Sequence, residues 1–189
     1  MSEKNINFHQ EIEQFNLATQ EMLKKSDRFR VVLLGAEIDR LLKLLLQAYL
    51  VPSRDGRDFL LEGGATFTTR IELGFRVGLL KPEWVDDLRV INAIRDKFAH
   101  GRAGLCLDKE PFRELCYTLQ FGQQWIDAGD NRGKEGDNSA TRFVATAVML
   151  ASHICVIGIT LKPLDPISKT YPEDLVELIK EEDRKSWGI

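Results

Sequence analysis

The feature that most constrains the fold is an uncharged stretch of nineteen residues, FVATAVMLASHICVIGITL, which runs from Phe143 to Leu161. A stretch of this length and composition is either a membrane span or a helix that other helices cover on all sides. Thr146, Ser152, His153 and Thr160 make it more polar than most spans. We therefore expect a buried helix in a bundle and no membrane association.

A second long helix is expected from about Arg28 to Leu50, with Asp27 as its N-cap and a place near the centre of the bundle. One polar strip interrupts its apolar circumference and comprises Ala36, Asp39, Arg40, Lys43 and Gln47. Glu37 lies outside this strip, among leucines. Because an unpaired buried carboxylate is costly, Glu37 is expected to contact a cation from a neighbouring helix.

Two further helices and a tight corner are predicted by TFTTRIELGFRVGLLKPEWVDDLRVINAIRDKFAHG, residues 66–101. Thr66 is the expected N-cap of the first helix, and Pro82 suits the first turn of the second. Gly101 can adopt the left-handed conformation that often ends a helix. Gly74 and Gly78 recur on the buried face of the first helix, which predicts that a neighbouring helix crosses closely over both.

Each of these two helices has an arginine in its apolar sector. At 100° per residue, Arg70 falls between Val77 and Gly74, and Arg95 falls between Trp84 and Leu88. Both arginines are therefore expected to point inward. The sequence predicts a buried ion pair between Glu37 and Arg70, Arg95 or both.

The strings TTRIELGFRVGLL and DDLRVINAIRDKFAH resemble the signature of the mannitol operon repressor family of bacterial regulators. The resemblance is best over residues 28–121, and its two motif segments are the specific part. It implies an all-helical fold without a conventional helix-turn-helix, and a role in transcription regulation as a repressor. Asp96 departs from the pattern, because the family usually has asparagine at this position.

Residues Arg95 to His100, RDKFAH, are also similar to the R-x4-6-H motif of HEPN-type helical ribonucleases and nucleotide-binding domains. In that interpretation His100 is the general acid or base, and Arg95 stabilises phosphate charge. The helical projection separates the two side chains by about 140°. The alternative is structural, with Arg95 paired to Glu37 and His100 at the helix C-terminus.

The remaining sequence predicts more helices and two loops. A helical pattern covers residues 5–25, another runs from Lys109 to Asp127 after the N-cap Asp108, and a short amphipathic helix starts at Pro172. Residues 52–65 are expected to be a loop with a short turn at 58–61, and residues 127–138 a flexible loop. The expected fold is all-α: one domain over residues 1–189, a bundle of about six or seven helices with a central hydrophobic helix.

Composition favours a cytoplasmic protein without a metal or another cofactor. Cys106, Cys116 and Cys155 lack the spacing of a zinc site or a disulfide framework, and the N-terminal residues lack the apolar core of a signal peptide. His153 is expected to be a hydrogen-bonded core histidine, because no metal-ligand spacing accompanies it. No phosphate-binding loop, dinucleotide fingerprint or nucleophile elbow is found.

Nucleic-acid binding would have to be local, because the formal net charge is -3 and the isoelectric point is about 5.7. The densest basic cluster comprises Lys24, Lys25, Arg28 and Arg30. It is either a solvated helix end or a patch that contacts phosphates weakly and with little sequence preference.

Two functions follow from these patterns. The first is a non-enzymatic transcriptional regulator that acts through a regulatory protein partner, with weak or indirect DNA contact, and that can form a homo-oligomer. The second is a metal-independent HEPN-type ribonuclease or toxin-like protein that uses Arg95 and His100. The sequence favours the regulator, because it contains no other enzyme motif.

Overall fold

The computed structural model describes residues 6–53, 58, 60–62, 64–128 and 138–164. Within these ranges the chain forms seven α-helices and no strands, as the sequence predicts. The helices are α1 (Phe8–Met22), α2 (Asp27–Tyr49), α3 (Phe67–Arg76), α4 (Pro82–His100), α5 (Phe112–Tyr117), α6 (Gln120–Ala128) and α7 (Ser139–Thr160).

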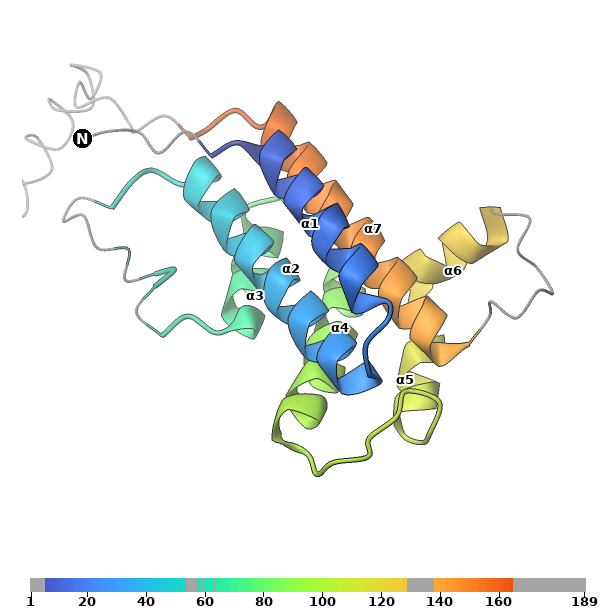
Figure 1. Cartoon of the computed structure of the whole chain (residues 1–189). Helices are drawn as coiled ribbons and strands as arrows, with labels where there is room; N and C mark the ends of the chain where they lie inside the picture. The colour runs from blue at the N-terminus through green and yellow to red at the C-terminus, as the bar shows by residue number, and fades with distance from the viewer. Residues whose placement is uncertain (1–5, 54–57, 59, 63, 129–137, 165–189) are drawn as a thin grey trace, which may run out of the picture.

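The long apolar helix α7 lies between the other elements of the bundle (Figure 1). It packs against α1, α2, α4, α5 and α6. This helix is also long and apolar enough to cross a membrane, and 44% of its most apolar window is buried in the bundle. Its packing against five helices agrees with the expected central hydrophobic helix.

Helix α2 runs beside α1 on one side and faces α3 and α4 on another (Figure 1). Its N-cap is Ser26, whose hydroxyl accepts the N–H of Phe29, and not Asp27 as predicted. Asp27 instead pairs with Arg30 and accepts the N–H of Leu107 at 2.9 Å. The carboxylate of Asp27 therefore attaches the loop after α4 to the start of α2.

The corner between α3 and α4 forms where the sequence predicts it. Thr66 caps α3 by accepting the N–H of Thr69 at 3.2 Å, and Pro82 begins α4. Gly101 is extended, with φ of -76°, and not left-handed. Its lack of a side chain is still required, because a Cβ there would lie 2.5 Å from the carbonyl oxygen of Lys97.

The two glycines of α3 and its following turn have different roles. Gly74 is buried, and a Cβ there would lie 3.0 Å from Leu80 and 3.5 Å from Leu42 of α2. Gly78 is exposed in the turn after α3, with φ of +77°, and a Cβ there would meet no atom within 4 Å. The prediction of a close helix crossing over Gly78 is therefore wrong, because this glycine is needed for its backbone conformation.

The helix predicted from Lys109 to Asp127 is broken into α5 and α6, and Asp108 does not start it. The side chain of Asp87 on α4, which is 1% exposed, accepts the N–H groups of Gln120 at 3.0 Å and Phe121 at 2.8 Å. These are free N–H groups of the first turn of α6. A carboxylate from another helix thus caps α6 and fixes where it starts.

Some predictions fall on residues that the structure leaves undescribed. The expected loop at 127–138 lies mostly outside the described residues, and so does the amphipathic helix expected from Pro172. The short turn expected at 58–61 is present, because Leu61 N–H bonds to Asp58. The assignment of all 189 residues to one domain stays a prediction.

Candidate functional site

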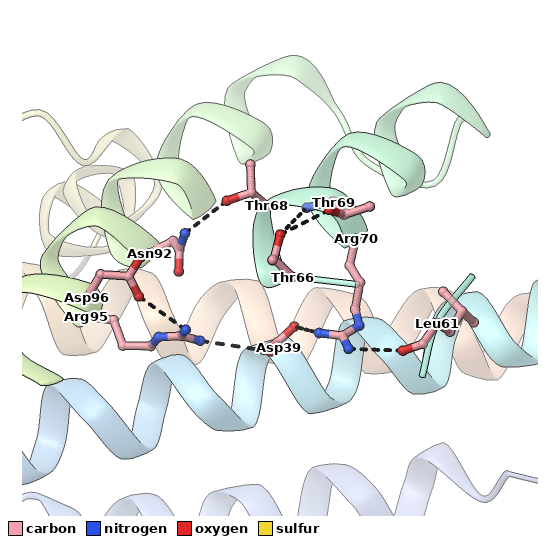
Figure 2. A network of polar contacts seen from close by, with 9 residues as sticks. All are labelled: Asp39, Leu61, Thr66, Thr68, Thr69, Arg70, Asn92, Arg95 and Asp96. Carbon is pink, nitrogen blue, oxygen red and sulfur yellow. Dashed lines mark hydrogen bonds and ion pairs between the residues drawn. The ribbon is translucent and has the colours of Figure 1, made fainter. Parts of the chain in front are cut away.

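Arg70 is the first member of a polar cluster between α2, α3 and α4 (Figure 2). It lies in the first turns of α3, whose start is fixed by the Thr66 cap. Its Nη1 donates to Oδ1 of Asp39 at 2.6 Å, and its Nη2 donates to the carbonyl oxygen of Leu61 at 3.0 Å. The side chain is 11% exposed, so Arg70 holds the loop before α3 against α2.

Arg95 approaches the same aspartate from α4 (Figure 2). Its Nη1 lies 3.9 Å from Oδ2 of Asp39, and its Nη2 donates to Oδ1 of Asp96 at 3.2 Å. The guanidinium carbon lies 5.5 Å from the centre of the Phe67 ring, which is a cation–π distance. The aliphatic stem of Arg95 lies against Gly35 of α2, where a Cβ would be 2.6 Å from Cδ of the arginine.

The cluster corrects the predicted ion pair, because Asp39 and not Glu37 is the partner of Arg70 and Arg95. Glu37 pairs with Arg40 on its own helix at 2.9 Å. Arg40 also contacts Glu11 of α1 at 2.7 Å. Glu37 therefore belongs to the contact between α1 and α2, whereas Asp39 faces α3 and α4.

Asp39 and Gly35 are the residues that the sequence interpretation misses at this site. Asp39 belongs to the polar strip of α2, which indicates a solvated side chain, yet that side chain is only 22% exposed. The available signal is the spacing of Gly35 and Asp39, which places both on one face of the helix. A glycine four residues before a carboxylate leaves room for a long cationic side chain to lie across α2.

The cluster has no excess positive charge, since Arg70 and Arg95 are balanced by Asp39 and Asp96. A phosphate at Arg95 would therefore compete with two carboxylates that already contact its guanidinium. A further hydrogen bond joins α4 to α3 beside the cluster, because the side-chain amide of Asn92 donates to the hydroxyl of Thr68 at 3.1 Å. These contacts connect three helices, which is a structural role.

His100 lies at the exposed C-terminal end of α4 and lines an open groove of about 620 Å³. The described residues that line this groove are Asp96, Lys97, His100, Gly101, Leu105, Glu110, Pro111 and Phe112. Arg95 does not line it. Asp96 accepts a hydrogen bond from Arg95 and also lines the groove with His100. The arginine and the histidine of the motif are therefore not brought to one surface within this chain.

The basic cluster is only partly available for a ligand. Arg30 pairs with Asp27, and Nη2 of Arg28 donates to the carbonyl oxygen of Ala99 at 3.1 Å, near the C-terminus of α4. Lys24 and Lys25 are exposed in the turn between α1 and α2. Of the four residues, the two lysines are the ones that can contact phosphates freely.

Two buried thiols, Cys116 and Cys155, and the half-buried His153 of α7 are placed for packing. Burial raises the pKa of the Cys116 thiol to about 12 and that of the Cys155 thiol to about 11, so neither is a nucleophile near neutral pH. A ring nitrogen of His153 lies 2.8 Å from the Met149 carbonyl oxygen, and the ring packs edge-on against Trp84. Among the described residues, no group of three or more histidine, cysteine or acidic side chains could hold a metal ion.

Comparisons of the chain with protein-family models, with curated proteins and with solved structures found no match.

Proposed function

We propose that the chain is a non-enzymatic regulator of transcription that acts through a protein partner, as the resemblance to mannitol operon repressors suggests. The observation that supports the non-enzymatic part of the proposal is the contact of Arg95 with Asp39 and Asp96 in a charge-balanced cluster. An arginine held in this way connects helices and is poorly placed to bind a phosphate.

Direct reading of DNA has little support in the described residues. Base readout needs arginine, lysine, asparagine or glutamine on an exposed element that fits the major groove. The basic cluster instead has two of its arginines engaged within the chain. A weak, salt-sensitive contact with DNA and a protein partner that supplies specificity fit this surface better.

The second candidate function is an HEPN-type ribonuclease, and one observation favours it. His100 is exposed in an open groove, and Asp96 lies between that groove and Arg95. An exposed imidazole in an open groove is compatible with acid–base catalysis. Under this alternative, a distortion at the end of α4 or a second subunit would have to bring an arginine and His100 together.

The proposed function is tested by comparing transcription in cells with and without the chain. We expect a small set of promoters to change their initiation rate when the chain is deleted, and the chain carrying His100→Ala to restore it. Nascent-transcript sequencing measures initiation, and transcript half-lives measured after transcription is blocked report RNA decay. If deletion of the chain changes only transcript half-lives, and the His100→Ala chain does not restore these half-lives, the protein degrades RNA and does not regulate initiation.

A further inference from the structure

A groove on the surface of α2 is lined by apolar and basic side chains. Neither candidate function described above explains its apolar side chains. Its described lining comprises Ser26, Arg28, Phe29, Val32 and Leu33, and its volume is about 420 Å³. Phe29, Val32 and Leu33 follow the spacing of one helical face. Phe29 is 45% exposed although α2 is a core helix, so an aromatic ring faces solvent at this groove.

One end of this α2 groove is positively charged. Lys24 and Lys25 directly precede Ser26 and are exposed, and Arg28 lines the groove itself. The chain as a whole carries a net charge of -3, so this end differs in sign from the average surface. An apolar floor with a basic edge selects a ligand that has an apolar side and acidic groups beside it.

We propose that the α2 groove binds an acidic amphipathic helix of a partner protein, and this inference rests on the proposed regulator function. The apolar side of such a helix would cover Phe29, Val32 and Leu33. Its carboxylates would pair with Lys24, Lys25 and the exposed part of Arg28. Helix-in-groove recognition of this kind needs a few apolar anchors on one helical face, which the floor of the groove can accept.

Two other occupants fit the groove less well. Nucleic acid would gain charge contacts from the lysines, but its phosphates would leave the apolar floor uncovered. A second copy of this chain in a twofold contact would place the same basic edge on both sides, and like charges would repel. An acidic amphipathic helix would both cover the apolar floor and pair with the basic edge.

The test is fluorescence anisotropy with the full chain and a labelled helical peptide that has leucines on one face and glutamates elsewhere. We expect this peptide to bind more tightly than a matched peptide with lysines in place of the glutamates. Phe29→Glu is expected to weaken binding by about tenfold or more, because it removes the aromatic anchor. Phe75→Glu is the matched control, since Phe75 is 42% exposed on α3 and lies outside the groove.

A second variant tests the basic edge. The double variant Lys24→Glu, Lys25→Glu is expected to lower the affinity for the acidic peptide by about tenfold and to reduce the salt dependence of its binding. Equal binding of the acidic and basic peptides, or no binding of either, would overturn the proposal. So would binding of a labelled DNA duplex that is tighter than binding of the acidic peptide, that Phe29→Glu leaves intact and that the lysine variant abolishes. Self-association in sedimentation that Phe29→Glu removes would overturn it as well.

Failure of the docking proposal and failure of the regulator function give different results. If the chain changes promoter initiation and the Phe29→Glu chain restores it fully, the groove is not the partner site and the regulator function stands. If the peptide binds as expected but deletion of the chain leaves initiation unchanged, the groove is a docking site and the regulator function is wrong.

Discussion

Replacing Asp39 with alanine is expected to lower the free energy of unfolding by about 2 to 4 kcal/mol. The substitution leaves Arg70 and Arg95 without their shared carboxylate, although both guanidinium groups are largely buried, at 11% and 24% side-chain exposure. Loss of one partner from a buried ion pair is costly because the other charge stays desolvated. Urea unfolding followed by far-UV circular dichroism measures the loss.

Glu37→Ala is the matched control for Asp39→Ala. Glu37 is on the same helix and pairs with Arg40 in a more exposed place, with side chains 30% and 40% exposed. Its removal is expected to cost only about 0.5 to 1 kcal/mol. If Glu37→Ala destabilised the chain as much as Asp39→Ala, the assignment of Asp39 as the central carboxylate would be wrong.

Replacing Asp87 with alanine is expected to cost about 2 to 3 kcal/mol, because it removes two charged hydrogen bonds at the start of α6. The N–H groups of Gln120 and Phe121 would then lack their carboxylate partner. Asp86→Ala is the control, since the neighbouring carboxylate is 66% exposed and lies 3.9 Å from the guanidinium of Arg89. Similar losses for the two variants in urea unfolding would contradict the capping role.

The burial of Asp87 also leads us to expect that the free energy of unfolding depends on pH. Burial raises the pKa of this carboxyl above its ordinary value of 3.8, while the two backbone hydrogen bonds act in the opposite direction. A raised pKa in the folded state means that the protonated carboxyl is favoured there, so this effect adds stability that is full below pH 3.8 and is lost as the pH rises through the raised value. Above that value the ionised carboxylate still accepts the two N–H groups of α6. The variant Asp87→Asn is expected to lack this part of the pH profile, which unfolding at a series of pH values will show.

The helix order could be predicted from the sequence because each helix has local signals. The Thr66 cap, Pro82 at the start of α4 and the uncharged run of α7 act within a few residues of each boundary. The break between α5 and α6 has a different cause. It depends on Asp87, more than thirty residues earlier in the chain, whose carboxylate reaches the start of α6.

The candidate site could be predicted only in part. The inward direction of Arg70 and Arg95 follows from the helical projection, and both side chains do lie between helices. Their partner could not be identified in this way, because α2 is apolar on most of its surface and packs against α1, α3, α4 and α7. A projection gives the face of a residue but not the neighbouring helix that covers it, so it assigns to Glu37 the role that Asp39 has.

The distance in sequence between contacting groups explains both errors. Asp39 and Arg70 are 31 residues apart, and Asp87 and Gln120 are 33 residues apart. Pairs of this kind depend on which helices become neighbours. The periodicity of a single helix gives no information about its neighbours. Gly35 is the local clue, because it opens the space in which Arg95 lies.

An RNA cleavage assay with the purified full chain in the presence of a chelator tests the proposal that Arg95 has a structural role and that the chain is a regulator and not a ribonuclease. We expect no cleavage above that of a parallel mock purification, for the wild-type chain and for His100→Ala alike. His9→Ala serves as the control for a histidine substitution, since His9 is exposed on α1, far along the chain from the motif. If the wild-type chain cleaves RNA, His9→Ala retains this activity and a folded His100→Ala loses it, the chain is a ribonuclease and the proposed regulator function is wrong.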